Sequence, residues 1–183
     1  MRVGVFCGSQ FGSIPGLKEE ACKVGKLLAS QGHELVYGGG SVGLMKQIAD
    51  GVLDAGGNVI GVIPTALREK ELAHESVQEM IEVKTMAERK DIMMEKSDIF
   101  ICLPGGYGTL DEMMEVITMN KLAYFRKPIG LWNFQGFYSS LDRFFLELKE
   151  KNFIHENLDG NDLPDYLINS VFSELLEDLI KIV

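Results

Sequence analysis

Residues 99–117 read IFICLPGGYGTLDEMMEVI and contain the pattern that decides the fold. Residues 99–103 are a short apolar run of the kind that forms a buried strand. A proline and three glycines follow within residues 104–108, which ends the strand and produces a turn. Residues 109–122 then have the length and composition of a helix. A strand, a short turn and a helix in this order are the repeating unit of a parallel sheet covered by helices.

The same alternation runs along the whole chain. We expect strands at residues 3–6, 35–37, 58–63, 82–85, 98–103 and 129–132. We expect helices at residues 17–30, 44–55, 87–96, 109–122, 136–151 and over most of 165–182, and we assign no structure to the polar residues 64–79. The sequence therefore predicts an α/β fold with a doubly wound, mostly parallel sheet of the Rossmann or flavodoxin type. We expect three α/β/α layers and a single nucleotide-binding domain over residues 1–183.

Composition limits the class of protein. Hydrophobic residues make up 46% and charged residues 25% of 183 residues, which is typical of a globular domain. No apolar stretch approaches the roughly 20 residues that a membrane span needs, and the first residues lack the pattern of a signal peptide, so we expect a cytoplasmic protein. The net charge of −9 disfavours a nucleic-acid polymer as partner, but not one small anion held by local donors. Three scattered cysteines and three scattered histidines predict reduced thiols and no metal site.

Glycine clusters follow the predicted strands at their carboxyl ends. Gly8 follows the first strand, residues 38–43 the second and residues 105–108 a later one. Doubly wound sheets bind their ligands at this edge, and glycine amides next to a helix start suit a phosphate. The alternative for each cluster is a tight turn without a ligand.

A dinucleotide pattern also occurs but is misplaced. Gly38, Gly40 and Gly43 spell G-x-G-x-x-G, although they follow the second predicted strand and not the first. The next strand, at residues 58–63, also ends without the acid that binds the ribose of NAD. We therefore disfavour NAD as a ligand.

The glycine-rich turn suits an anion, yet two acids stand directly behind it. Thr109 can cap the following helix, which would place Glu112 in the first helical turn and Glu115 on the same face. The acids can then reach a neighbouring part of the same ligand, such as ribose hydroxyls or a water molecule. The alternative is that acids merely favour a helix N-terminus, which we prefer for Asp111 but not for Glu112.

Arg89 and Lys90 open a predicted helix and are candidate cations for the anion. Arginine can bind phosphate in a bidentate manner, although a charged pair on a helix is more often a solvated face. Six methionines cluster in the helices at 87–96 and 109–122 or just before them. They indicate core filling or, alternatively, a dimer face, because methionine suits adaptable apolar surfaces.

The residues taken together resemble a known family. M-x-x-R-K (residues 86–90) followed by P-G-G-x-G-T-x-x-E (residues 104–112) resembles the Lonely Guy family of cytokinin riboside 5′-monophosphate phosphoribohydrolases, also labelled lysine decarboxylase-like. C-G-S at residues 7–9 and Y-G-G-G-x-x-G-L-M at residues 37–45 are similar to the same family. The resemblance covers about residues 2–155.

The resemblance implies a Rossmann-like homodimer that hydrolyses the N-glycosidic bond of a nucleoside 5′-monophosphate without a cofactor. Arg89 and Glu112 resemble its catalytic pair. The candidate substrate-binding residues are Ser9, Gly39, Gly40, Glu71, Lys90, Gly106, Tyr107, Gly108, Thr109 and Glu115. In this interpretation the glycines bind the phosphate end of a nucleotide and the acid acts at its ribose.

Two departures from the family pattern leave the base open. Lys46 stands where the family usually has glycine, and Met119-Asn120-Lys121 replaces the Trp-Ala-Gln of plant members, in a segment that we expect to line the base pocket. The base is then N6-prenylated adenine, the adenine of AMP, or another. A nucleotide carrier or sensor without turnover is the alternative function. A decarboxylase would need pyridoxal phosphate on a lysine, and no lysine of the sequence is a convincing candidate.

Overall fold

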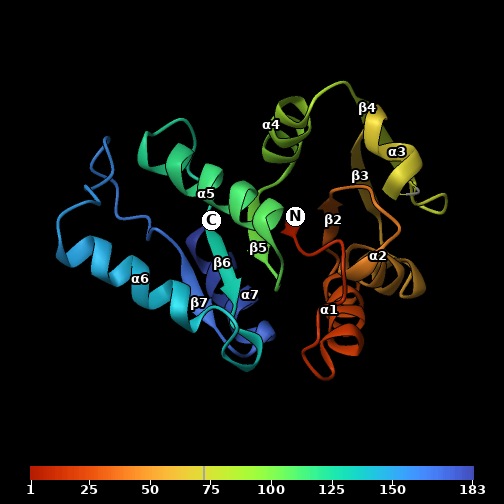
Figure 1. Ribbon diagram of the computed structural model, residues 1–183, viewed down its shortest axis with the longest axis horizontal. Helices are drawn as coiled ribbons and strands as arrows, with labels where there is room; N and C mark the ends of the chain where they lie inside the picture. The colour runs from red at the N-terminus through yellow and green to blue at the C-terminus, as the bar shows by residue number, and fades with distance from the viewer. Residues whose placement is uncertain (72) are drawn as a thin grey trace.

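The protein forms one parallel sheet between layers of helices (Figure 1). The computed structural model describes residues 1–71 and 73–183, and the side chains of residues 69–71 also lie outside its description. The strands are β1 (Arg2–Phe6), β2 (Glu34–Tyr37), β3 (Val59–Pro64), β4 (Glu79–Val83), β5 (Ile99–Cys102), β6 (Ile129–Trp132) and β7 (Leu167–Asn169). They lie in the order β4-β3-β2-β1-β5-β6-β7, and each neighbouring pair is parallel.

Two groups of helices cover the two faces of the sheet. The helices are α1 (Leu17–Ser30), α2 (Gly43–Asp54), α3 (Thr65–Glu71), α4 (Met86–Lys96), α5 (Tyr107–Lys121), α6 (Ser139–Glu150) and α7 (Phe172–Ile182), with a short 3-10 helix at Phe134–Gly136. Buried side chains of α1, α2 and α7 pack on one face, together with inward residues of the central strands. Buried side chains of α4, α5 and α6 pack on the other. The prediction of a doubly wound α/β fold is confirmed.

The switch point of the sheet lies between β1 and β5. From β1 the chain winds outward through β2 and β3 to β4, and it then returns to pair β5 with the free side of β1. The connections after β1 and β5 therefore leave the sheet in opposite directions, which opens a crevice at the carboxyl ends of these strands. The loops after β1, β2 and β5 are those that contain the glycine clusters.

The structure differs from the sequence-based expectation at both edges of the sheet. β4 begins at Glu79, not at residue 82, and its polar, half-exposed character hides the strand pattern. Thr85, which we expected in this strand, instead caps α4 by accepting a hydrogen bond from the Glu88 amide at 3.1 Å. β7 occupies three residues of a segment that we expected to be mostly helix, because pairing with β6 outweighs local preference.

One helix begins earlier than expected, and another forms where no helix was expected. α5 begins at Tyr107 with Gly106 as its N-cap, so Thr109 does not cap the helix and Glu112 lies in its second turn. α3 forms within the residues to which we assigned no structure. Across the residues that the structure describes, every helix is too short or too polar to cross a membrane.

Candidate functional site

A cavity of about 380 Å³ lies at the switch point, where β1, β2 and β5 end. Its walls come from the end of β1, from the loops after β1 and β5, and from Gly38 after β2. One residue each of α2 and α3, two of α4 and four of α5 complete them. Of the predicted site residues, those that line it are Ser9, Arg89, Gly106, Tyr107, Gly108, Thr109 and Glu112. The fold thus brings the proposed catalytic pair and the glycine-rich turn together.

Arg89 is buried, with 6% of its surface exposed, and two main-chain carbonyls hold it. Its Nε donates a hydrogen bond to the Val62 oxygen at 3.1 Å, and its Nη2 donates to the Gly38 oxygen at 2.8 Å. Val62 lies within β3 and Gly38 directly follows β2, so the sheet itself fixes the guanidinium. A Cβ atom at position 38 would stand 1.8 Å from Nη2, and only glycine leaves room for this contact.

Glu112 reaches the cavity from α5 and lies opposite the same guanidinium. Its Oε1 is 3.9 Å from Arg89 Nη1, and 8% of the residue is exposed. Nε and Nη2 are engaged by carbonyls, so Nη1 is the nitrogen that faces the carboxylate. This geometry differs from the bidentate phosphate contact that the sequence suggested for Arg89. The two charges form a buried pair at the base of the cavity.

The Glu112 carboxylate also raises the pKa of two buried thiols, those of Cys7 and Cys102. Burial raises the pKa of Cys7, and the charge of Glu112 raises it further, against the smaller opposing effect of Arg89. Burial and the charge of Glu112 also raise the pKa of Cys102. Both thiols therefore stay protonated at neutral pH and are poor nucleophiles.

The amino-terminal end of α5 forms the polar wall of the cavity. Gly105 packs tightly, since a Cβ there would lie 2.1 Å from the Thr109 Oγ1, whereas a Cβ at Gly106 or Gly108 would meet no atom within 4 Å. The Gly8 amide donates to the Pro104 oxygen at 3.2 Å and ties the β1 and β5 loops together. A helix N-terminus with open glycines beside a cavity is suited to an anion.

Gly43 holds the loop after β1 against the start of α2. Its φ is +56°, and a Cβ would lie 2.2 Å from the Ser9 carbonyl carbon. The Leu44 amide donates to the Gly8 oxygen at 3.0 Å. These contacts place Ser9 at the cavity wall, while its surface remains exposed.

Other predicted substrate-binding residues lie elsewhere. The Gly39 oxygen accepts a hydrogen bond from the His74 amide at 3.1 Å, and Gly40 forms an antiparallel bridge with Ala73. Both glycines are buried in these contacts. Glu71 ends α3, and its side chain lies outside the described part of the structure.

Lys90 and Glu115 bind each other rather than facing the cavity. Lys90 Nζ lies 2.7 Å from Glu115 Oε2 and 2.9 Å from Asp111 Oδ2. The hydrogen bond to Glu115 raises the pKa of Lys90, against the opposite effect of burial, and the bond to Asp111 adds to the rise. The Lys90–Glu115 ion pair joins α4 to α5, the two helices that carry Arg89 and Glu112.

We expect Lys90→Met to lower the free energy of unfolding by about 1 kcal/mol, because the variant breaks this ion pair. The pKa of Lys90 is raised in the folded state, so the contribution is complete below the ordinary value of 10.5 and is lost as the pH rises through the folded-state pKa. Urea unfolding at pH 7 of Lys90→Met, Glu115→Gln and the double variant measures the coupling. Strictly additive losses would contradict a stabilising pair.

Sequence reasoning missed the apolar wall of the cavity and the role of Gly38. Met45, Leu67 and Met86 line the cavity, and the sequence marks two of them only as letters of motifs. Gly38 was noticed only as a member of the glycine cluster and of the motifs at residues 37–45, and not as a contact of Arg89. The signal that could have identified it is three consecutive glycines directly after a buried strand, where another chain segment approaches the backbone.

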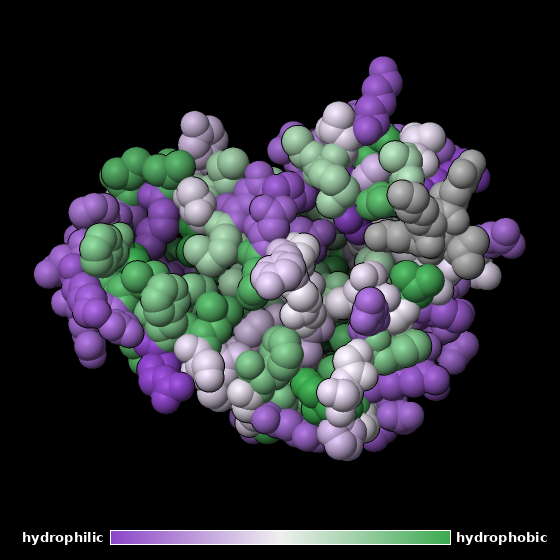
Figure 2. Space-filling view, in the orientation of Figure 1, coloured by the Kyte–Doolittle hydropathy of each residue, from purple (hydrophilic) through white to green (hydrophobic). Residues whose placement is uncertain are grey.

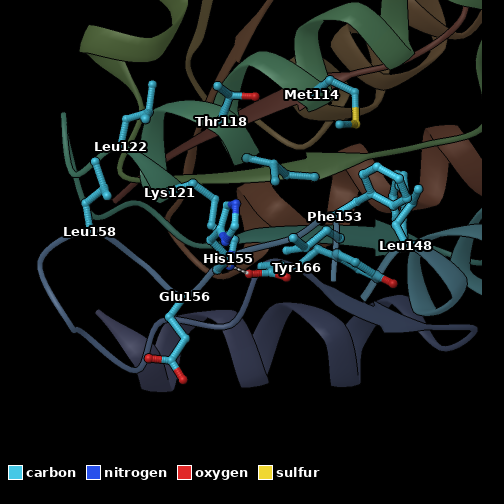
Figure 3. A pocket seen from close by; sticks show the side chains of 14 residues that line it. Met114, Thr118, Lys121, Leu122, Leu148, Phe153, His155, Glu156, Leu158 and Tyr166 are labelled. Carbon is cyan, nitrogen blue, oxygen red and sulfur yellow. Dashed lines mark hydrogen bonds and ion pairs between the residues drawn. The ribbon is translucent and has the colours of Figure 1, made fainter. Parts of the chain in front are cut away.

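A second cavity, of about 390 Å³, lies apart from the first (Figure 3). Met114, Thr118 and Lys121 of α5, with Leu122 directly after it, face Leu148 of α6 and the segment from Phe153 to Leu158 across this cavity. Lys121 lines this apolar cavity, and Asn120 donates to the Lys127 oxygen at 2.8 Å. The segment 119–121, which we expected to line the base pocket, is therefore not part of the Arg89 cavity in this chain.

Comparison with known proteins adds family information to this geometry. The family model described as "Possible lysine decarboxylase" matches residues 45–160. The chain is 50% identical over 140 residues to LOGL9 of Oryza sativa subsp. japonica, named a "Probable cytokinin riboside 5′-monophosphate phosphoribohydrolase". That match covers 76% of this chain and 62% of the rice protein, which is less than two thirds of its length. Cytokinin riboside 5′-monophosphate phosphoribohydrolase LOG1 of Arabidopsis thaliana is 47% identical over 153 residues, which are 84% of this chain and 72% of that protein.

Solved structures show the same fold. The Moco carrier protein of Chlamydomonas reinhardtii superimposes with a TM-score of 0.74 at 21% identity, over 99% of this chain and 96% of that one. The molybdenum cofactor binding protein of Rippkaea orientalis gives a TM-score of 0.69 at 25% identity, over 98% and 94% of the two chains. These likenesses concern the arrangement of strands and helices.

Proposed function

This chain belongs to the Lonely Guy (LOG) family of cytokinin riboside 5′-monophosphate phosphoribohydrolases, and we propose that it hydrolyses the N-glycosidic bond of a nucleoside 5′-monophosphate. The products are a free base and ribose 5-phosphate. The observation that carries the proposal is the buried Arg89–Glu112 pair, which faces a cavity with an open helix N-terminus. We propose further that the 183 residues act as one nucleotide-binding domain.

Glu112 acts at the ribose. Cleavage of the bond between C1′ and the base leaves positive charge on the sugar ring, and a carboxylate stabilises such an oxocarbenium-like state. The bonding electrons leave with the base, which takes up a proton. Water adds to C1′, and Glu112 accepts the proton that the water loses and then releases it to solvent, which balances the proton that the base takes up. Arg89 fixes the carboxylate through its Nη1, while the Val62 and Gly38 carbonyls fix Arg89.

The amino-terminal end of α5 binds the 5′-phosphate. The positive end of the helix dipole is formed by the amides of residues 106–109. The open space at Gly106 and Gly108 lets an anion approach these amides closely. Glu112 is farther along α5 and is held by Arg89, so it need not meet the phosphate. The glycines and the acid thus act on different ends of one nucleotide.

The remaining walls suit the base and the sugar. Met45, Leu67 and Met86 offer apolar surface for a flat purine, and methionine adapts to ligand shape. Ser9 lies at the wall and is proposed to contact the substrate. Gly39, Gly40, Glu71, Lys90 and Glu115 stay proposed substrate-binding residues on the family resemblance.

The substrate is tested by incubating the purified protein with AMP and with N6-isopentenyl-AMP and following free base by chromatography. Release from the prenylated nucleotide alone would identify a cytokinin-activating enzyme. Release mainly from AMP would retain the glycosidase and assign it to general nucleotide turnover. Binding of both nucleotides without any release of base would contradict the proposal and favour a carrier.

We also propose that the protein is a homodimer that buries the exposed apolar face of α5. Figure 2 shows apolar side chains gathered on the side of the molecule that carries α5 and α6. The large hydrophobic residues exposed on α5 and next to it are Tyr107, Met114, Leu122, Tyr124, Phe153 and Leu158. A gathering of exposed apolar side chains on one side of a molecule is typical of an interface.

We expect the wild type to sediment at micromolar concentration with twice the 20.3 kDa mass of one chain. Met114→Lys places a charge on the exposed face of α5, which we expect to shift the population to monomer. Sedimentation velocity measures both states. A wild-type monomer under these conditions would contradict the proposed dimer.

A further inference from the structure

Three side chains outside the cavity form a connected hydrogen-bonded group. Asp50 of α2 accepts a hydrogen bond from Lys46 Nζ at 2.8 Å on one carboxylate oxygen. Its other oxygen lies 2.9 Å from Nε2 of His74. The imidazole is 6% exposed, although it belongs to the connection between α3 and β4. His74 therefore anchors the connection between α3 and β4 to α2 through a specific hydrogen bond.

The contacts assign the direction of this hydrogen bond. The Ser76 amide points at Nδ1 of His74 at 3.4 Å, so Nδ1 is the acceptor and Nε2 carries the hydrogen that is donated to Asp50. Burial raises the pKa of Asp50, but the hydrogen bonds from Lys46 and His74 outweigh it and leave this pKa below its ordinary value. Asp50 is therefore an ionised acceptor at neutral pH.

His74 anchors the chain to the same turn that holds Arg89. Its amide donates to the Gly39 oxygen at 3.1 Å, next to the Gly38 oxygen that accepts from Arg89 Nη2. The neighbouring residue, Ala73, bridges Gly40. Consecutive residues of one turn therefore bind the proposed catalytic arginine and the segment that follows α3.

The position of α3 matters because it supplies part of the cavity wall. Leu67 of α3 lines the cavity, and the amino-terminal end of the helix is held by Thr65, whose hydroxyl donates to the Val83 oxygen at 3.1 Å. At the other end, the connection to β4 is fixed through His74. Loss of the His74 side-chain contact would loosen this second end, which would then keep only its main-chain contacts to Gly39 and Gly40, while Arg89 and Glu112 stay in place.

We propose that the Asp50–His74 hydrogen bond positions α3 as a wall of the nucleotide cavity, and that His74 is thereby a positioning residue for substrate binding. This inference rests on the proposed function. It concerns affinity for the nucleoside monophosphate rather than the bond-breaking step, because the reacting groups are held by other contacts.

The test compares His74→Ala with His74→Gln, whose side-chain amide can still donate to Asp50. We expect His74→Ala to raise the KM for the better nucleotide about tenfold, as the loss of a hydrogen bond to a charged group predicts. We expect kcat to change by less than about threefold, and His74→Gln to restore most of the affinity. His33→Gln is the matched control, because His33 directly precedes β2, at the amino-terminal end of that strand, whereas the cavity lies at the carboxyl ends of the strands.

Hydrogen exchange on the apo protein provides a readout that does not need turnover. Peptides that cover residues 65–80 are expected to exchange faster in His74→Ala and at the wild-type rate in His74→Gln. An unchanged KM in His74→Ala, or equal effects of alanine and glutamine, would overturn the inference and leave the proposed function intact.

If the wild type released no base, the proposed function would fail, and AMP affinity measured by calorimetry on the same variants would decide the inference. If His74→Ala did not fold, a normal KM in His74→Gln would support it and a tenfold higher KM would overturn it.

Discussion

Glu112→Gln is expected to lower the rate of base release by about 10²–10⁴-fold, the usual contribution of a positioned acid or base. The amide keeps the shape of the side chain at the 8% exposed position, but it carries no charge to stabilise the ribosyl cation and accepts no proton from water. Nucleotide affinity is expected to change far less, because the proposed phosphate site lies at the start of α5. Single-turnover kinetics separate the two effects.

Asp111→Asn is the matched control for this variant. It makes the same acid-to-amide change one residue earlier on α5, where the side chain points away from the cavity and pairs with Lys90. We expect its rate of base release to stay within about twofold of wild type. If Glu112→Gln released base as fast as Asp111→Asn, Glu112 would have no catalytic role.

Gly38→Ala is expected to reduce base release about 100-fold although it replaces neither proposed catalytic residue. The added methyl group would stand 1.8 Å from Arg89 Nη2, so the guanidinium must leave the Gly38 carbonyl and lose its place opposite Glu112. Overpacking of this kind also costs about 1–3 kcal/mol of stability. The rate per folded molecule is the quantity to compare, with circular dichroism giving the folded fraction.

Gly130→Ala separates the loss of stability from the loss of geometry. A Cβ at Gly130 in β6 would lie 2.8 Å from the side-chain ends of Leu175 and Leu179, on the face covered by α7 and away from the cavity. We expect a comparable loss of stability with an unchanged rate per folded molecule. Equal rates in the Gly38 and Gly130 variants would show that the Arg89 position does not matter for the reaction.

Much of the fold was predictable, because its central strands are short apolar runs between turn residues. The edge strands were predicted only in part, because the expected strand at residues 82–85 overlaps β4 only at residues 82–83 and β7 was not expected. β7 is three residues long and β4 is half-exposed, so each depends on pairing with a neighbour rather than on its own pattern. The start of α5 was placed two residues late, because Gly106 serves as the N-cap where threonine is the commoner choice.

The candidate site was predictable as a set of residues but not as an arrangement. Motifs and strand ends pointed to Arg89 and Glu112, since the carboxyl ends of parallel strands meet at one edge. The carbonyls that hold Arg89 are 27 and 51 residues away in sequence, and no local pattern reveals such a contact. The same limit explains why the sequence did not reveal that Lys90, adjacent to Arg89, pairs with Asp111 and Glu115.

The most direct measurement is the phosphorus NMR spectrum of AMP incubated with the wild-type protein, with free base followed in the same sample. Hydrolysis of the N-glycosidic bond keeps the phosphate ester, so we expect the AMP signal to be replaced by that of ribose 5-phosphate, with one adenine released for each. If AMP is not the substrate, we expect N6-isopentenyl-AMP to be converted in the same way to ribose 5-phosphate and one free base for each. Inorganic phosphate with intact nucleoside, or both nucleotides unchanged after long incubation, would contradict a glycosidase at the Arg89–Glu112 site.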